Sequence, residues 1–377
     1  MKFTAQSKVL YNQALAVSRV INSKNAMAVL SNFLFTLNGN ELTITASDVE
    51  NTVTAKVAVN SLDGDGMFCV DARKIVDLLK ELPDQGITFE INDSNFAIKI
   101  TSINGDFNLI GLNGLQYPRQ EADEQNDGKM NFRVPAKQIL SGLDNTLFAI
   151  GHDEIWPQMM GVYFDIKTDN ITFVSTDSRK LVKYVDGTGQ PGVEGSFILP
   201  GKPAAILKNL IGKAEGEIEV AITGKSGTFT VDDFTLNCRF IKGQFPDYNR
   251  VIPQTNPFEV TVDRVQFLNA LKRVAVFVEQ GHGMVKMQIE PSQITLQSQD
   301  IAVCTSGLET VPCTVSGSKL IIGFSAPLLI EICSTMQSPE MVIKLADPAR
   351  PGLFLPSENP EGTELLMLLM PMNVGEY

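Results

Sequence analysis

Few residues of this chain could carry out catalysis at neutral pH. His152 and His282 are the only histidines, and histidine is the side chain whose unperturbed pKa lies nearest neutrality. Both occur in short polar or glycine-flanked stretches that are typical of loops. Asp169 and Asp177, in TDNITFVSTDSRKL, fit turn or strand-end positions. A hydrolase or transferase would need a nucleophile near Asp177 or His152, and the sequence does not identify one.

Phosphate-binding and metal-binding motifs are also missing. GKS at 224–226 resembles a phosphate-binding loop, but the glycine required five residues earlier is Glu219. No GxSxG, HExxH or GxGxxG motif is present. The cysteines form no CxxC pair and lie far from the histidines, so we predict reduced thiols that pack as small core residues: Cys69, Cys238, Cys304, Cys313 and Cys333. We therefore predict a protein that is not an enzyme, with no metal or cofactor.

The composition is that of an ordinary globular chain. It has 377 residues, of which 44% are hydrophobic and 20% charged. At about 100–200 residues per domain, this length predicts two to four domains. The opening MKFTAQSKVL lacks the apolar region of a signal peptide, and no stretch approaches the ~20 apolar residues of a membrane span. We expect a soluble cytoplasmic protein that does not associate with membranes.

Three segments of the chain open alike. They are KFTAQSKVLYNQALAVSRVI from residue 2, NFRVPAKQILSGLDNTLFAI from 131 and PFEVTVDRVQFLNALKRVAVFV from 257. Each begins with a short alternating strand around a phenylalanine and then changes to the helical spacing of apolar residues. Those residues, Phe3, Phe132 and Phe258, are 129 and 126 residues apart. This period has the size of a domain, so the chain is predicted to contain three similar domains.

Each repeat continues in the same order after its opening. A strand–turn–strand pair is followed by a strand, a second helix, a break and further strands, which predicts a β-α-β-β-β-α-β-β-β unit of the α+β class. A polar linker at 119–129 and a proline-rich one at 251–257 place the domains at 1–122, 130–253 and 256–377. The six predicted helices are near 7–22, 72–82, 136–149, 201–213, 263–278 and 326–336.

Positive charge is concentrated in the predicted helices. They hold 12 Lys and Arg against 5 Asp and Glu, whereas the rest of the chain holds 19 against 38 and the net charge is −12. Such segregation favours helices that face phosphate. The simpler explanation is that Lys and Arg are good helix formers with solvated heads, although Glu, an equally good helix former, is scarce there. Since no base-reading motif is present, any contact should be to backbone charge and independent of sequence.

The C-terminal run at 365–372 contains apolar residues only, although chain ends are usually polar. The run occupies the place of the last strand in the third repeat, so core packing explains most of its character. Three of its residues are methionines, which suit a groove that must adapt to several ligands. Part of the run is therefore expected to bury itself and part to line a groove.

Several short motifs carry a family resemblance that covers essentially the whole chain. They are MKFT at the start, ARK at 72–74, STDSRKL at 175–181, GQFPDYNRVIP at 243–253, IGF at 322–324 and MPM at 370–372. With the triple repeat, they resemble the bacterial sliding-clamp family, the β subunits of DNA polymerase III. The resemblance implies a ring-shaped head-to-tail homodimer of clamp domains, with helices lining a central hole and antiparallel sheets outside. It implies a processivity factor that encircles duplex DNA and catalyses nothing.

The resemblance also implies a hydrophobic pocket between the second and third domains. In the family it receives short linear peptides of the replicative DNA polymerase, the clamp loader and repair proteins. The matching pocket residues here are Met159, Met160, Thr176, Arg179, Lys180, Leu181, Pro246, Arg250, Val251, Leu369, Met370, Pro371 and Met372. The residues that match DNA-facing positions are Lys24, Arg73, Lys74 and Lys202.

The chain departs from the family pattern at two places. A His-Arg pair is usual where this chain has Arg179-Lys180, and a lysine cannot reproduce the planar fork of arginine. The chain also continues through 373–377 after the MPM motif. The alternative is a three-domain scaffold that binds protein partners without encircling DNA. A native mass near twice 41.2 kDa would favour the ring.

Overall fold

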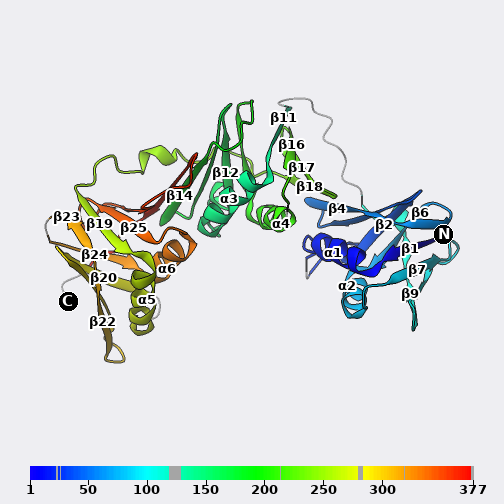
Figure 1. Ribbon diagram of the computed structural model, residues 1–377, viewed down its shortest axis with the longest axis horizontal. Helices are drawn as coiled ribbons and strands as arrows, with labels where there is room; N and C mark the ends of the chain where they lie inside the picture. The colour runs from blue at the N-terminus through cyan, green and yellow to red at the C-terminus, as the bar shows by residue number, and fades with distance from the viewer. Residues whose placement is uncertain are drawn as a thin grey trace. The chain divides into compact units, whose positions relative to one another are not determined.

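The computed structural model describes residues 1–22, 24–25, 27–118, 129–212, 214–278, 283–317 and 319–374 (Figure 1). The expectations for His282, for most of the linker at 119–129 and for 375–377 lie outside the described residues. The chain forms two compact units, one made of Met1–Lys137 and Lys202–Phe240 and the other of Gln138–Gly201 and Ile241–Tyr377.

The first unit holds the first repeat and about half of the second. The first repeat supplies β1 (Lys2–Gln6), α1 (Ser7–Ser18), β2 (Asn32–Asn38), β3 (Glu41–Ser47), β4 (Asn51–Ala58), β5 (Asn60–Asp63), β6 (Gly66–Asp71), α2 (Ala72–Glu81), β7 (Gly86–Ile91), β8 (Ala97–Thr101), β9 (Asp106–Ile110) and β10 (Leu112–Asn113). The second repeat adds β11 (Met130–Pro135), nearly all of α4 (Gly201–Ile211), β16 (Glu217–Thr223), β17 (Ser226–Val231) and β18 (Phe234–Arg239).

The second unit holds the rest of the second repeat and the third repeat. From the second repeat come most of α3 (Ala136–Thr146), β12 (Gly161–Ile166), β13 (Ile171–Thr176), β14 (Lys180–Asp186) and β15 (Gly195–Pro200). The third repeat supplies β19 (Phe258–Asp263), α5 (Arg264–Val274), β20 (Met284–Glu290), β21 (Gln293–Asp300), β22 (Thr305–Pro312), β23 (Thr314–Ser316), β24 (Leu320–Ser325), α6 (Ala326–Thr335), β25 (Glu340–Leu345), β26 (Gly352–Pro356) and β27 (Thr363–Leu369).

Each unit contains a nine-stranded antiparallel sheet that joins two repeats edge to edge. In the first unit the strand order is β10-β6-β2-β3-β4-β18-β17-β16-β11, and in the second it is β15-β12-β13-β14-β27-β26-β25-β19-β23. We call the β4–β18 pairing the first joint and the β14–β27 pairing the second joint. Two smaller sheets, β5-β1-β7-β8-β9 and β22-β21-β20-β24, complete the described strands.

All six predicted helices are present in the described residues, and each ends earlier than predicted. At the end of α1 the apolar spacing continues to Val20 and Ile21, while their amides turn back to the carbonyls of Val17 and Ser18. Such i to i+3 bonds tighten the last turn of a helix and end it. The Asp71 side chain caps α2 by accepting from the amide of Lys74.

Each repeat contains at least one strand more than predicted. One additional strand in each repeat, β4, β14 or β22, follows the predicted strand–turn–strand pair, and the short strands β5, β10 and β23 are also additional. Two of them, β4 and β14, form the joints, so the element missing from the prediction is the one that connects the repeats. Each of the two also pairs with the strand before it, β3 or β13. The partner across the joint is far away in sequence, and local periodicity does not report such a partner.

The helices bury one face against the sheets. The buried residues of α1 are Ser7, Leu10, Ala14 and Val17, a spacing that places them on one side of a helix. Aromatic rings fill the cores of the repeats, with Phe3 stacked on Phe89 at 4.9 Å between centroids and Phe164 stacked on Phe197 at 4.6 Å. None of the described helices is long and apolar enough to cross a membrane.

The cysteines follow the prediction only in part. Cys69, Cys238 and Cys333 are buried, and burial raises the pKa of the Cys69 thiol to about 11. Cys304 is exposed in the turn between β21 and β22, so the prediction that every cysteine packs in a core is wrong there.

Candidate functional site

The turn between β13 and β14 is held by its own polar side chains. The Thr176 hydroxyl accepts from the amide of Ser178 at 3.1 Å and donates to the carbonyl of Lys180 at 2.8 Å. An oxygen of Asp177 accepts from the amides of Arg179 and Lys180 at 2.9 and 2.8 Å. Ser178 adopts a φ of 71°, a left-handed conformation that is uncommon for residues other than glycine. The TDSRKL motif therefore specifies a fixed turn at the start of β14.

A largely apolar cavity of about 210 Å³ opens beside this turn. Its walls come from the turn, from the connection after β18 and from the end of β27. The lining residues are Met159, Thr176, Ser178, Arg179, Lys180, Leu181, Phe245, Pro246, Asp247, Tyr248, Val251, Leu368 and Met370. All of them belong to the second unit.

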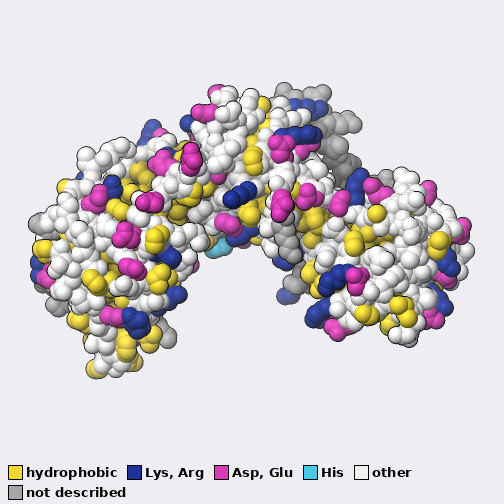
Figure 2. All heavy atoms as spheres, in the orientation of Figure 1, with side chains coloured by type: hydrophobic (Ala, Val, Ile, Leu, Met, Phe, Trp, Pro, Cys, Tyr) yellow, Lys and Arg dark blue, Asp and Glu magenta, His cyan; other side chains and the backbone are white. Residues whose placement is uncertain are grey.

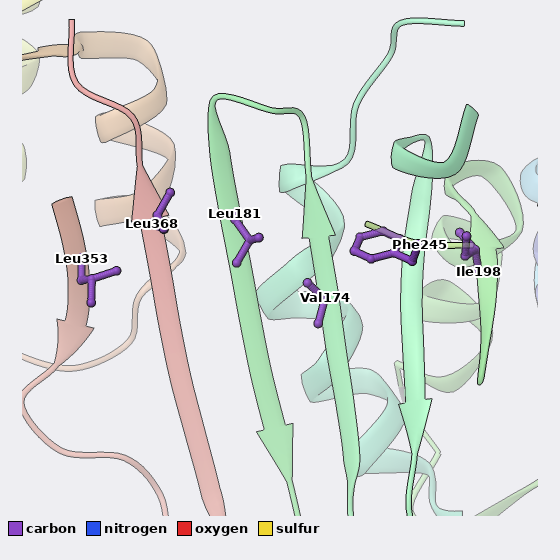
Figure 3. Packing of buried hydrophobic residues seen from close by; sticks show 6 residues of the cluster. All are labelled: Val174, Leu181, Ile198, Phe245, Leu353 and Leu368. Carbon is purple, nitrogen blue, oxygen red and sulfur yellow. The ribbon is translucent and has the colours of Figure 1, made fainter. Parts of the chain in front are cut away.

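A compact hydrophobic cluster lies at the second joint beside the cavity. Figure 3 shows three of its members on the adjacent strands β13, β14 and β27, and the others on β15, on β26 and in the connection after β18. The members are Val174, Leu181, Ile198, Phe245, Leu353 and Leu368. Each is at most 6% exposed. Three of them, Leu181, Phe245 and Leu368, also line the cavity. The cavity wall is therefore supported by packed side chains, which favours a site formed before any ligand arrives.

The structure brings eight of the thirteen predicted pocket residues together around this cavity: Met159, Thr176, Arg179, Lys180, Leu181, Pro246, Val251 and Met370. The other five do not line it. The carbonyl of Met160 accepts a hydrogen bond from the amide of Gly201. Leu369 is fully buried, and the exposed Arg250 pairs with Asp247 at 2.8 Å. Pro371 and Met372 follow the cavity wall, and Met372 bonds to β24.

Five lining residues were not predicted: Ser178, Phe245, Asp247, Tyr248 and Leu368. Phe245 stacks on Tyr163 at 4.8 Å between ring centroids. The Tyr248 hydroxyl donates to a carboxylate oxygen of Asp165 at 3.2 Å. Burial, aided by the Asp165 charge, raises the pKa of Tyr248 to about 12, so this phenol stays protonated at neutral pH. All but Leu368 lie inside the quoted STDSRKL and FPDYNRV motifs, so the motifs marked the segments but not which side chains face inward.

Lys180 does not present a free cation to the cavity. Its side chain is only 5% exposed, and Nζ lies 2.5 Å from Oε2 of Glu331 in α6 and 3.6 Å from Oδ2 of Asp177. The ammonium also lies 5.4 Å from the centre of the Phe148 ring, within the range of a cation–π contact. The lysine that replaces the usual arginine therefore links the second repeat to the third.

The predicted DNA-facing residues fall into two groups. Lys24 and Lys74 are exposed, and Arg73 is 92% exposed at its side chain, 3.7 Å from Asp77. Figure 2 shows Lys and Arg side chains gathered where Figure 1 places α2. Lys202 differs, because its ammonium donates to the carbonyl of Val20 and pairs with the carboxylate of Asp48. Lys202 thus joins the second repeat to the first.

The described residues offer little catalytic chemistry. His152 lies in an exposed loop, and the carboxylate of Asp177 is occupied by turn amides and by Lys180. No cluster of three His, Cys, Asp or Glu side chains suited to a metal ion occurs among the residues that the structure describes. The arrangement is suited to binding an apolar ligand in the cavity and phosphate at α2.

Three protein-family profiles match consecutive parts of the chain. They are the N-terminal, central and C-terminal domains of the DNA polymerase III beta subunit, matching residues 1–121, 133–247 and 249–373. The Beta sliding clamp of Treponema pallidum is 27% identical over 378 residues, which cover 99% of both chains.

Two solved structures share the fold over nearly the whole chain. A DnaN sliding clamp from Bartonella birtlesii bound to griselimycin has a TM-score of 0.92 and 27% identity, covering 99% of this chain and 100% of that one. The DNA polymerase sliding clamp from Caulobacter crescentus has a TM-score of 0.89 and 26% identity with the same coverage.

Proposed function

The chain belongs to the bacterial sliding-clamp family, the β subunits of DNA polymerase III, and from this premise we propose how its parts perform that role. It is a processivity factor and not an enzyme. We assign its domains to residues 1–122, 130–253 and 256–377, and its place of action to the cytoplasm. Two chains close head to tail into a ring around duplex DNA.

The observation that carries this proposal is the repeated joint. At both joints, the strand after the strand–turn–strand pair of one repeat pairs with the last strand of the next repeat, as β4 does with β18 and β14 with β27. The strands left over are β22 of the third repeat and β9 of the first, which is the third strand after the second helix of its repeat, as β18 and β27 are of theirs. Both β22 and β9 lie at the edges of their described sheets. Pairing β22 of one chain with β9 of another would repeat the joint, and doing so twice closes a ring.

The side chains at these two edges support the pairing. Ile110 on β9 is 85% exposed and Leu308 on β22 is 67% exposed. In the turn before β22, Ile301 and Val303 are 74% and 64% exposed. An exposed apolar edge strand invites association with another strand, so these residues fit an interface between subunits.

DNA would be held by charge alone. Lys24, Arg73 and Lys74 have exposed side chains and are proposed to contact phosphates through salt-sensitive bonds that do not read bases. Lys202 is proposed to contribute less, because Asp48 already neutralises its ammonium. Weak contacts permit sliding, and ring closure supplies the residence time.

The apolar cavity at the second joint is proposed to bind short linear motifs of the replicative DNA polymerase, the clamp loader and repair proteins. Its lining of methionine, leucine and aromatic side chains suits a partner that inserts apolar residues. Griselimycin, which is bound to the Bartonella birtlesii clamp, is proposed to occupy the same cavity here.

The test is retention on DNA. The chain is loaded by a clamp loader onto nicked circular or linear duplex DNA, and the bound fraction is followed at rising salt. Retention on circles with loss from linear ends supports a topological ring. Equal loss from both would overturn the ring and favour a scaffold that does not encircle DNA.

Matched variants locate the closure. Ile110→Lys places a charge on β9, and Leu62→Lys places one on β5, at the opposite edge of the same sheet, where Leu62 is 57% exposed. We expect Ile110→Lys to weaken the dimer about 100-fold and to abolish retention on circles. Leu62→Lys should leave both unchanged. Equal behaviour of the two variants would exclude β9 as the interface strand.

A further inference from the structure

The C-terminal segment passes from one sheet to another as it leaves the cavity. The amide of Met370 donates to the carbonyl of Arg179 in the β13–β14 turn at 2.8 Å. The amide of Met372 donates to the carbonyl of Gly323 at 2.8 Å, and the two residues form an antiparallel bridge. Gly323 lies in β24, at the edge of the four-stranded sheet. Two hydrogen bonds thus fix the segment, one at each sheet.

The MPM motif fits these two bonds. Pro371 lies between the two donating amides and has no N–H of its own, so the short segment leaves no backbone donor unpaired between its anchors. Two residues of extended chain span about 6.5–7 Å. A displacement of Met372 is therefore transmitted to Met370, which is 41% exposed and lines the cavity.

Gly323 leaves room for this segment because it has no side chain. A Cβ built there would lie 2.8 Å from Cγ2 of Val374, 2.9 Å from Sδ of Met284 and 3.0 Å from the carbonyl oxygen of Met372. Its neighbours Ile322 and Phe324 are fully buried and alternate to the other face of the strand. The glycine of the IGF motif is thus required by the close approach of the chain end.

We propose that Gly323 is a positioning residue for the cavity: by seating Met372 it holds Met370 in the cavity wall. Gly323 does not line the cavity itself, so its effect on ligand affinity is indirect. This inference rests on the proposed function of the cavity as the ligand-binding pocket.

The test measures griselimycin binding by titration calorimetry, together with the thermal unfolding midpoint. Gly323→Ala should weaken binding by about threefold to tenfold and speed hydrogen exchange at the Met372 amide. In a chain that ends after Pro371, binding should be weakened to a similar extent. Gly323→Ala should then add no further loss, because the contact that it disturbs has been removed.

Gly227→Ala is the matched control. It also adds a methyl group to a strand glycine, where the Cβ would meet Cζ of Phe240 at 2.3 Å, and Gly227 does not line the cavity. It should lower the unfolding midpoint and leave griselimycin affinity unchanged.

Three results would overturn the inference. The first is a Gly323→Ala variant with a lower unfolding midpoint and unchanged affinity. The second is an equal loss of affinity in Gly227→Ala, and the third is a loss that adds in the truncated chain. Absence of griselimycin binding in the unaltered chain would instead overturn the pocket assignment on which the inference rests.

Discussion

The turns at the two joints have similar backbone conformations, but the ion pairs across the joints run in opposite directions. In both, a hydroxyl side chain (Ser47 or Thr176) bonds to the carbonyl of the turn's fourth residue, and an aspartate accepts the amide of that residue. In both, the second turn residue has a positive φ, 83° at Val49 and 71° at Ser178. The two turns therefore have the same hydrogen-bonding pattern.

The ion pairs across the joints run in opposite directions. At the first joint the earlier repeat supplies the acid, Asp48, and the later repeat supplies the base, Lys202. At the second joint the earlier repeat supplies the base, Lys180, and the later repeat supplies the acid, Glu331. A strand pairing can thus be kept while its charges are exchanged, and the second joint keeps a cavity beside it.

The largest effect should come from the first joint. Lys202→Ala leaves Asp48 without its partner lysine, and the Asp48 side chain is only 6% exposed. Leaving a buried charge without its partner lowers the free energy of unfolding by about 3 kcal/mol, which urea titration would measure. Lys74→Ala, at an exposed lysine of α2, is the control and should change it by less than ~0.5 kcal/mol. A loss below ~1 kcal/mol in Lys202→Ala would mean that the pair does not secure the joint.

A smaller effect should come from the second joint. Lys180→Ala leaves Glu331, which is 46% exposed and regains contact with water. We therefore expect a loss of about 1–2 kcal/mol in the same titration, with the contact to Phe148 contributing. Lys56→Ala, which removes an exposed pair with Glu41, is the control. A loss equal to that of Lys202→Ala would remove the distinction between the joints.

A third change acts on binding more than on stability. Met370→Ala removes an apolar part of the cavity wall and should weaken griselimycin about threefold to tenfold, measured by calorimetry. Met370 is 41% exposed, so the unfolding free energy should fall by less than ~1 kcal/mol. Met27→Ala alters a methionine of similar exposure (44%) outside the cavity and should leave the affinity unchanged. If Met27→Ala weakened griselimycin binding more than Met370→Ala, Met370 would not form part of the binding wall.

The smallest effect concerns an ion pair outside both joints, between Arg273 of α5 and Glu309 of β22. The hydrogen bond from Arg273 holds the pKa of Glu309 below its ordinary value, so the pair stabilises above that ordinary value and is lost as pH falls through the lowered pKa. Arg273→Ala should lower the urea midpoint slightly at pH 7, and the difference should shrink as pH falls below the ordinary pKa of a glutamate and vanish below the lowered pKa of Glu309. If the difference in urea midpoint persists in acid, it comes from the packing of Arg273 and not from the ion pair.

The repeat pattern predicted the helices because their apolar spacing is local. The joint strands escaped prediction because β4 and β14 pair with strands much later in the chain. The family motifs located the cavity, but they did not indicate which of their residues line it. Phe245 lines the cavity, whereas Arg250 does not and pairs with Asp247. Charge counting likewise grouped Lys202 with exposed lysines, since composition does not reveal a partner such as Asp48.

The turn before β22 carries an exposed thiol that can report whether the adjacent edge is covered. Cys304 is exposed there, whereas Cys313 is half-buried and Cys69, Cys238 and Cys333 are buried. Thiol reagents require access as well as the thiolate. A maleimide dye would therefore label the free edge first. If β22 is covered when two chains join, the labelling rate at this position measures how often the ring opens, in real time and without any substitution.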